Sequence, residues 1–259
     1  MKNSCSTNVT LPEGLPIVIT GSTGGIGKEI VRAVARLGLP MILPCRSENK
    51  FNILGREIID EFPHAELHYL PLDLNDSQSV DAALASLAGK PLAGVINNAG
   101  IMCRRYSISP DGIETTLNVN YFNTARFSDA LLPQIARGGA MVFTTSITRL
   151  LVPGHADAAS VNRHTFGQLK TYALSKKLIT DHALSLAPAA AARGVRINCC
   201  DPGVVDSGMI KMNRWYDPLA DIFFRPLIRS PRRGAMPAVR ALLSPLSARI
   251  FTLRRIHTR

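Results

Sequence analysis

The sequence lacks the features that direct a chain into or across a membrane. None of its 259 residues belongs to an uncharged apolar run of about 18, the length that a spanning helix needs. The first 14 residues are polar and hold no apolar run of signal-peptide length. We therefore expect no spanning helix and no secretory signal, and we predict a cytoplasmic location.

Cysteine is scarce, and its spacing matches no metal or disulfide pattern. The five cysteines form no CxxC pair and have no histidines at metal-ligand spacing. Reduced thiols in a cytoplasmic protein explain them, and we expect no metal site.

Acidic residues are outnumbered, and the imbalance is uneven. The formal charge is +11, but residues 212–259 hold ten arginines, no lysine and two acids, which accounts for +8. The first 211 residues are therefore nearly balanced. We predict no specific nucleic-acid partner.

Short apolar runs alternate with segments of helical periodicity over most of the chain, and 46% of the residues are hydrophobic. Such alternation indicates βαβ units, a parallel sheet and helices on both faces. The predicted fold is α/β: one doubly wound domain of three α/β/α layers. The expected strands are 15–20, 40–45, 66–70, 93–96, 140–144 and 195–199; the expected helices are 25–37, 49–62, 77–87, 119–134 and 171–186.

A glycine-rich stretch, VITGSTGGIGKEI, joins the first strand to the first helix. Gly21, Gly25 and Gly27 read G-x-x-x-G-x-G, which differs from the dinucleotide fingerprint G-x-G-x-x-G. A helix N-terminus offers unpaired N–H groups to a pyrophosphate, and glycines let it approach. A tight strand–helix turn without a ligand is the alternative that the stretch alone leaves open.

Of four further features, three follow later strands, where ligands of open parallel sheets bind, and the fourth lies on an expected helix. Tyr172 and Lys176 are spaced i and i+4, which places both on one face of a helix. The features are Asn97-Asn98-Ala99-Gly100, Ser146, the Tyr172/Lys176 pair and Asp201-Pro202-Gly203.

This ordered set resembles the short-chain dehydrogenase/reductase family, whose glycine turn is itself written G-x-x-x-G-x-G. The resemblance implies a Rossmann-type fold and an oxidoreductase that interconverts a carbonyl and an alcohol with a nicotinamide cofactor. It covers roughly residues 14–210 and is carried by the motifs at 20–27 and 97–100, Asn120, Ser146, Tyr172-x-x-x-Lys176 and Pro202-Gly203.

The resemblance also implies roles for four side chains. Tyr172 would be the acid/base, although a free tyrosine titrates near pH ~10. The positive charge of Lys176 would favour the phenolate, and this lysine would hold the nicotinamide ribose. Ser146 would hydrogen-bond the substrate oxygen. Asn120 would support a proton relay through water, with Asn118 as the weaker candidate.

Cofactor choice depends on the end of the second strand. NAD-binding proteins place a carboxylate about 20 residues beyond the glycines. Here Arg46 stands in a segment without an acid, and a guanidinium can pair with a 2′-phosphate. We predict NADP(H), with NAD(H) as the alternative. The implied cofactor residues are Gly21, Ser22, Thr23, Gly25, Ile26, Gly27, Arg46, Asp73, Leu74, Asn98, Ala99, Gly100, Tyr172, Lys176, Pro202, Gly203, Val205 and Ser207.

Ser146 and Tyr172 are separated by 26 positions. In this separation the sequence resembles the branch of the family that contains retinol dehydrogenases and protochlorophyllide reductases. That branch implies a bulky apolar carbonyl or alcohol substrate. Residues 147–170 would form a loop beside the site. The rival hypothesis is a dinucleotide-binding sensor or interaction protein without catalysis.

We divide the chain into a flexible tail (1–14), a dinucleotide-binding and catalytic domain (15–206), a substrate lid (207–235) and a basic segment (236–259). The last segment departs from the family, because a basic, semi-apolar sequence stands where we would expect a final strand. It could touch an anionic membrane surface or nucleic acid weakly, pack on another subunit, or be an altered end that leaves the sheet incomplete. The resemblance also implies a homo-oligomer.

Overall fold

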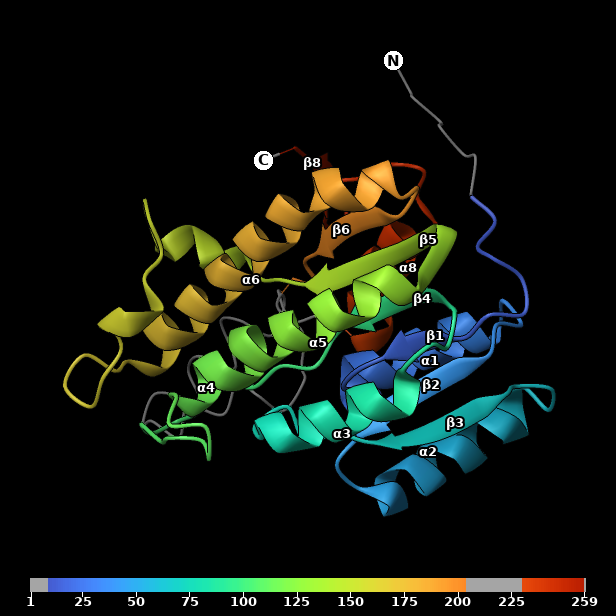
Figure 1. Cartoon of the computed structure of the whole chain (residues 1–259), viewed down its shortest axis with the longest axis horizontal. Helices are drawn as coiled ribbons and strands as arrows, with labels where there is room; N and C mark the ends of the chain where they lie inside the picture. Colours follow the sequence, from blue (N-terminus) through green and yellow to red (C-terminus); the bar gives the residue numbers. More distant parts are fainter. Residues whose placement is uncertain (1–8, 204–229, 259) are drawn as a thin grey trace.

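One eight-stranded sheet runs through the computed structural model, which describes residues 9–203 and 230–258 (Figure 1). Its strand order is β3-β2-β1-β4-β5-β6-β7-β8, and all neighbours are parallel except the last pair. The order reverses between β1 and β4, which is where open α/β sheets bind ligands. The strands are β1 (Ile17–Ile19), β2 (Met41–Cys45), β3 (Leu67–Pro71), β4 (Leu92–Asn97), β5 (Ile135–Thr144), β6 (Arg196–Cys200), β7 (Ile250–Phe251) and β8 (Ile256–His257).

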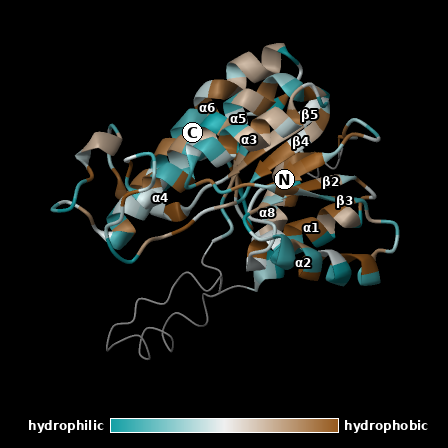
Figure 2. Cartoon of the chain, turned by 60° about the horizontal axis from the view of Figure 1, so that its bottom comes forward, coloured by the Kyte–Doolittle hydropathy of each residue, from teal (hydrophilic) through white to brown (hydrophobic). Residues whose placement is uncertain are grey.

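Helices cover both faces of this sheet, so the predicted three-layer α/β/α class is confirmed. In Figure 2 the central strands are brown, and teal residues lie on the outer helices. One face is covered by α1 (Gly25–Ala35), α2 (Glu48–Glu61) and α8 (Pro231–Leu243), and the other by α3 (Ser77–Leu87), α5 (Asn123–Leu131) and α6 (Gln168–Ala192).

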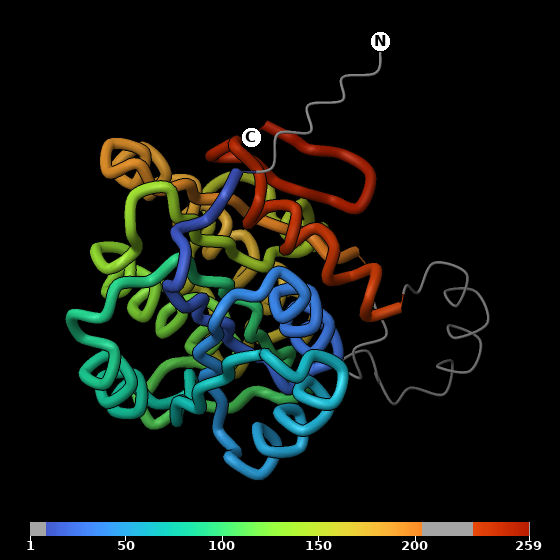
Figure 3. The backbone as a smooth tube through the Cα atoms, turned by 90° about the vertical axis from the view of Figure 1, so that its right-hand side faces the viewer, coloured from blue at the N-terminus to red at the C-terminus, as the bar shows by residue number. Residues whose placement is uncertain are grey.

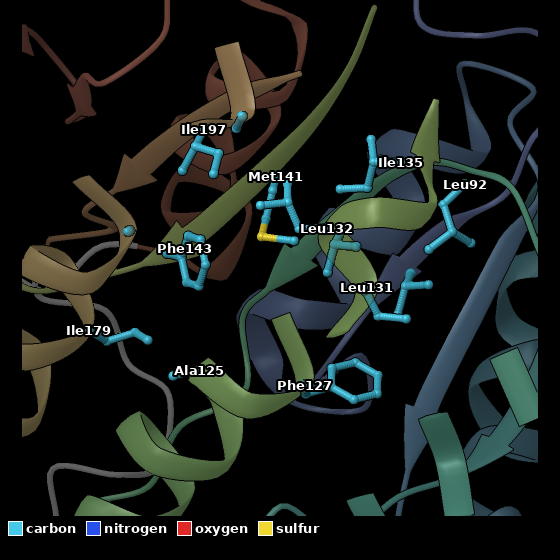
Figure 4. Close-up of a cluster of buried hydrophobic side chains, with 14 of the residues drawn as sticks. Leu92, Ala125, Phe127, Leu131, Leu132, Ile135, Met141, Phe143, Ile179 and Ile197 are labelled. Atoms are coloured by element: carbon cyan, nitrogen blue, oxygen red, sulfur yellow. The ribbon is translucent and has the colours of Figure 1, made fainter. Parts of the chain in front are cut away.

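The larger core lies between the sheet and the second group of helices. Phe127 of α5 and Phe143 of β5 are fully buried there. Figure 4 shows side chains of β5 and β6 facing those of α5 and α6 across this layer. Burying a phenylalanine side chain stabilises the fold by roughly 1.5–3 kcal/mol, so this layer fixes the positions of α5 and α6.

The helix starts agree with local sequence signals. Ser47 caps α2 by accepting a hydrogen bond from the Lys50 amide (3.3 Å), and Asp76 caps α3 by accepting one from Gln78 (2.9 Å). Each cap satisfies an amide that the helix itself leaves unpaired. The expected helix over 119–134 is less regular than its pattern predicts.

That region begins with α4 (Thr115–Leu117) and continues as a π-helical turn, η1 (Asn118–Phe122), before α5 starts. The turn contains one more residue per hydrogen-bonded ring than an α-helix. Asn118, Asn120 and Asn123 are all buried in this stretch. The chain then passes through two 3₁₀ turns after β5, η3 (Ile147–Leu151) and η4 (Ala158–Ser160), within the predicted loop 147–170.

The expectation that the C-terminal segment lacks the final strand is wrong. Ile250 and Phe251 form β7, pair in parallel with β6 and are buried at 4% and 1% exposure. Strand β8 then turns back on β7, so the sheet is complete. Helix α8 and this hairpin, red in Figure 3, hold most of segment 236–259, and α8 packs against α1.

Two other boundaries also change. Leu11 is 5% exposed and the Val9 amide donates to the Leu243 carbonyl (3.1 Å), so a flexible tail does not extend to residue 14. Residue 235 lies inside α8, so the division at this residue cuts a continuous helix. Residues 204–229, which include most of the predicted lid, lie outside the described residues.

Candidate active site at the carboxyl edge of the sheet

The glycine turn after β1 is shaped by close backbone contacts. Gly21 has φ +67°, and a Cβ there would lie 2.8 Å from the Ala99 Cα. A Cβ on Gly27 would lie 2.0 Å from the Gly21 carbonyl oxygen. Glycine is therefore required at both positions, because any side chain would push α1 away from the turn.

The same turn leaves hydrogen-bonding groups free. Gly24 is the N-cap of α1 and provides no side-chain cap, and the first turn of α1 holds no acid. The Ser22 hydroxyl is buried without a partner within the described part of the chain. Unpaired amides at a helix N-terminus, a buried hydroxyl and a glycine-lined surface suit a pyrophosphate.

The end of β4 is fastened to this turn. The Asn98 side-chain amide donates to the carbonyls of Thr20 and Gly21, each at 3.2 Å. The backbone amides of Asn98 and Ala99 both donate to the Thr20 hydroxyl at 3.1 Å. Thr20 thus joins two predicted cofactor motifs, a role that its position before Gly21 could have suggested but that sequence reasoning missed.

A cavity of about 350 Å³ lies along these elements, within the range of small-molecule sites. Arg46 at its rim is exposed, and Asp73 is half-buried with its carboxylate accepting from the Asn75 amide (2.9 Å). The predicted cofactor residues that line it are Gly21, Thr23, Gly25, Ile26, Gly27, Arg46, Asp73, Leu74, Asn98, Ala99 and Gly100. Ser22 is fully buried and does not line the cavity, and neither do the other described members of the set, Tyr172, Lys176, Pro202 and Gly203. Val205 and Ser207 lie outside the described residues.

Tyr172 and Lys176 project from α6 toward the end of β5. The Lys176 ammonium lies 5.8 Å from the centre of the Tyr172 ring and donates to the Thr144 carbonyl (2.8 Å). A Cβ on Gly100 would be 3.2 Å from the Lys176 nitrogen and 3.4 Å from the Asn120 Oδ1. Gly100 is therefore the point at which the lysine and the asparagine approach each other.

Asn120 is held by three hydrogen bonds. It exchanges two with the Ile101 backbone, both at 2.8 Å, and donates a third to the Ser175 hydroxyl at 3.0 Å. The alternative candidate, Asn118, faces away from Lys176 and donates to Asp111 (2.8 Å). Of the two asparagines, the structure brings Asn120 to the Tyr172/Lys176 pair.

Ser146 begins η3 and caps it by accepting from the Thr148 amide (3.3 Å). The Thr148 hydroxyl also donates to the Ser146 hydroxyl (3.0 Å). A hydrogen bond between Ser146 and Tyr172 lowers the pKa of the tyrosine. The structure thus brings together Asn120, Ser146, Tyr172 and Lys176, which are 56 positions apart at most.

Burial determines the ionisation of the two central groups. It raises the pKa of Tyr172 to about 12, an effect that Asp201 increases and Ser146 opposes. Burial also lowers the pKa of Lys176 from 10.5 to about 8, while the nearby thiols and Asp201 act in the opposite direction. A tyrosine and a lysine perturbed in this way beside a cavity are typical of a functional site.

The family model for short chain dehydrogenases matches residues 16–216, and the chain belongs to this family of oxidoreductases, which act on alcohol and carbonyl groups and bind NAD(P). Among curated proteins it is 32% identical to mouse polyprenol dehydrogenase (Mus musculus), with 90% of this chain and 72% of that protein covered. It is 31% identical to human retinol dehydrogenase 12 (Homo sapiens), with 96% and 80% covered.

Solved structures agree on the fold. Levodione reductase superposes with a TM-score of 0.74 at 20% identity, covering 92% of this chain and 95% of that one. A short-chain dehydrogenase from Sphingobium yanoikuyae in complex with NADPH gives 0.69 at 18% identity, covering 93% and 88%. These likenesses confirm the Rossmann-type fold.

No helix in residues 9–203 or 230–258 has both the length and the apolar character of a membrane span. Within the same ranges, no three His, Cys, Asp or Glu side chains gather so as to hold a metal ion.

Proposed function

We propose that this chain is an NADP(H)-dependent oxidoreductase that interconverts a carbonyl and an alcohol on a bulky apolar substrate, with Tyr172 as the acid/base. The observation that carries the proposal is the meeting of Ser146, Tyr172, Lys176 and Asn120, of which Lys176 and Asn120 lie next to Gly100 in the cavity wall. A merely binding protein has no need of a tyrosine and a lysine buried together, because their desolvation is costly.

The bound nicotinamide would supply the hydride, and the glycine turn, Arg46 and Lys176 would hold the dinucleotide. The chain's own residues manage the proton. Tyr172 donates its hydroxyl proton to a carbonyl oxygen that Ser146 hydrogen-bonds, or accepts one from an alcohol. Lys176, while charged, favours the phenolate. Asn120 stands beside Lys176, where a water molecule can return a proton from solvent.

Two features support the finer assignments. Arg46 directly follows β2 in a segment without a carboxylate, which favours NADP(H), and a structural neighbour was solved in complex with NADPH. Beyond Ser146, the side chains of Ile147, Leu150 and Leu151 are 57–68% exposed. An exposed apolar surface next to a site favours an apolar ligand. Relatives named for polyprenol and retinol fit that substrate class.

Tyr172→Phe is the direct test. The protein and this variant are assayed with NADPH against a panel of apolar aldehydes and ketones. Removing an acid/base group is expected to lower kcat roughly 10²- to 10⁴-fold while NADPH binding persists. Equal activity would refute the mechanism, and no turnover by either protein while both bind NADPH would favour the sensor hypothesis.

Cofactor choice has a separate test. Arg46→Ala should raise the KM for NADPH roughly 10-fold, the equivalent of one charge-assisted hydrogen bond of about 1.4 kcal/mol, and leave the KM for NADH unchanged. Arg56→Ala, an exposed arginine on α2, is the matched control. An unchanged preference would remove the assignment of Arg46.

The remaining assignments stay predictions. They are a cytoplasmic location, a homo-oligomer, weak contact of the basic C-terminal segment with a membrane surface, and no specific nucleic-acid partner. Sedimentation and binding to anionic vesicles test the oligomer and the surface contact.

A further inference from the structure

Two charged side chains lie nearly buried beside the catalytic group, and the mechanism above does not use them. Arg149 belongs to η3, and Asp201 follows β6. Their Nη1 and Oδ2 atoms are 3.7 Å apart, and the side chains are 14% and 7% exposed. Both partners of every other ion pair within the described residues are more exposed than these two. Charges are rarely removed from water in this way without a function or a partner.

Each member of the pair also holds a backbone group of the site. Arg149 Nη1 donates to the Ser146 carbonyl (3.2 Å), and Asp201 Oδ1 accepts from the Gly203 amide (2.9 Å). The residues that precede these turns are direct neighbours, since Thr144 of β5 pairs with Cys200 of β6. The ion pair therefore bridges the turn that carries Ser146 and the Pro202–Gly203 turn.

The pair also contributes charge to the site. The ionisable groups that act on Asp201 or respond to it come from η3, α6, β6 and β8: Arg149, Tyr172, Lys176, Cys200 and His257. The Asp201 carboxylate raises the pKa values of Tyr172 and Lys176. Burial raises the pKa of Asp201 itself, and Arg149 opposes that effect. The guanidinium thus keeps the carboxylate charged and partly cancels its field.

We propose that Arg149 and Asp201 are positioning residues that tie Ser146 to the Pro202–Gly203 turn and present a compensated charge to Tyr172 and Lys176. The inference rests on the proposed roles of Ser146, Tyr172 and Lys176. Its test therefore includes a measurement that needs no substrate.

The two halves of the pair should have opposite effects on Tyr172. Asp201→Asn keeps an acceptor for the Gly203 amide but removes the negative charge, so the phenol should ionise at lower pH. Arg149→Met leaves the carboxylate without its cation. Asp201 is ionised at the high pH at which a tyrosine titrates, so the phenol should then ionise at higher pH.

NMR of ¹³C-labelled tyrosine follows this titration directly, with Tyr172→Phe assigning the signal. The midpoint is expected to fall in Asp201→Asn, to rise or leave the accessible range in Arg149→Met, and to lie between them in the double variant. A Tyr172 midpoint that shifts in the same direction in both single variants, or does not shift, would overturn the charge role. A purely structural contact gives no reason for the two variants to shift the midpoint in opposite directions.

Activity tests the positional role. Arg149→Met should lower kcat/KM roughly 10²-fold, as a 1 Å displacement of a site residue can. Arg149→Lys should restore the pH profile more fully than kcat/KM, since it keeps the charge without the planar fork. Unchanged kcat/KM in Arg149→Met would overturn the positional role.

The exposed pair Arg126–Asp81, which joins α5 to α3, provides the matched controls Arg126→Met and Asp81→Asn. Neither should move the Tyr172 titration. If the parent protein turns over no carbonyl substrate, the proposed function fails, and the NMR titration still decides whether the pair sets the ionisation of Tyr172.

Discussion

The glycine turn after β1 and the polar cluster around Tyr172 lie at the same edge of one sheet, yet they are built by opposite means. The turn presents backbone and excludes side chains: a single Cβ on Gly27 would meet a carbonyl at 2.0 Å. The cluster presents side chains and buries them, and Lys176 is 3% exposed. The glycine turn is therefore constrained by the space available for a side chain, and the polar cluster by the cost of desolvating its charged groups. Substitutions in the two regions should reveal this difference.

The largest loss of stability is expected in β7, the strand that supports both regions. Phe251 of β7 is 1% exposed, and its carbonyl accepts from the Asp201 amide (2.8 Å). Phe251→Ala should lower the free energy of unfolding by about 4 kcal/mol. Chemical denaturation measures it, with the half-exposed Ile256→Ala of β8 as the control that should change little. A small loss from Phe251→Ala would mean that the final strand is dispensable.

Gly27→Ala should break the turn alone. Because the new methyl group meets backbone rather than a flexible side chain, we expect a loss of about 3 kcal/mol and no measurable NADPH binding. Gly55→Ala on α2, where a Cβ meets nothing within 4 Å, is the control and should gain roughly 0.5–1 kcal/mol. Calorimetry and fluorescence titration with NADPH measure both. Normal NADPH affinity in Gly27→Ala would show that the turn can adapt.

Lys176→Met, in the polar cluster, should raise the free energy of unfolding, whereas Phe251→Ala and Gly27→Ala lower it. Burial lowers the pKa of Lys176 from 10.5 to about 8. This shift means that burying the charged lysine lowers the stability of the parent protein by about 3 kcal/mol at pH 7. The lost hydrogen bond to Thr144 offsets about 1 kcal/mol, so the inactive variant should be more stable by about 2 kcal/mol.

The pH dependence checks this explanation. Between pH 8 and 10.5 the unfolded chain holds more protons on this lysine than the folded chain does, so the stability of the parent rises with pH. The advantage of Lys176→Met should therefore fade across that window and reverse above it, where only the lost hydrogen bond to Thr144, about 1 kcal/mol, remains. An advantage that is constant with pH would point to packing instead.

The smallest effect is expected at Asp111, which joins the start of α3 to the π-helical turn and α5. Asp111 Oδ2 accepts from the side-chain amides of Asn118 (2.8 Å) and Asn123 (3.0 Å), and Oδ1 accepts from the Ser77 hydroxyl (2.6 Å). These bonds hold the pKa of this half-exposed carboxyl well below its ordinary 3.8. In Asp111→Asn, an amide group that donates hydrogen bonds would face the amide donors of Asn118 and Asn123. We expect this variant to lose about 1 kcal/mol in the free energy of unfolding.

That loss should be full at neutral pH and shrink in acid. The carboxylate stabilises the fold above its unfolded pKa, and the contribution disappears as the pH falls through the lower, folded value. Thermal melting of Asp111→Asn and the parent from pH 7 to pH 3 measures the difference. A gap that widens in acid would contradict the assigned hydrogen bonds.

The sequence predicts the first six strands and the glycine turn because their signals are local. Apolar runs end at glycine or proline, and helical periodicity follows. Even β2 forms where expected despite Pro44, which pairs in register with Leu70. The glycine turn, residues 98–100, Ser146 and Pro202–Gly203 were predicted to lie together because each follows a strand, and parallel strands end at one edge. Tyr172 and Lys176 lie inside α6, and their i and i+4 spacing together with the family resemblance predicted them.

Non-local contacts account for what was missed. Strand β7 is two residues long and lies among arginines, so only its pairing with β6, some 50 positions earlier, identifies it. Arg149 and Asp201 are 52 positions apart, and either alone is indistinguishable from a surface charge. Strand β5 begins at Ile135, earlier than expected, because Gly138 and Gly139 obscure the apolar run.

The π-helical turn at Asn118–Phe122 makes chain length itself matter at one point of the fold. Elsewhere, a loop can gain or lose a residue and the neighbouring elements stay in place. Deleting one residue here would restore regular α-helical winding and leave α4 and α5 facing as they do, because a π-helical turn takes one more residue for about the same rotation. The loss would instead fall on the turn itself, where Asn120 is held by the Ile101 backbone and Ser175. The residue count of this turn is therefore set by the position of Asn120 and not by the packing of α5.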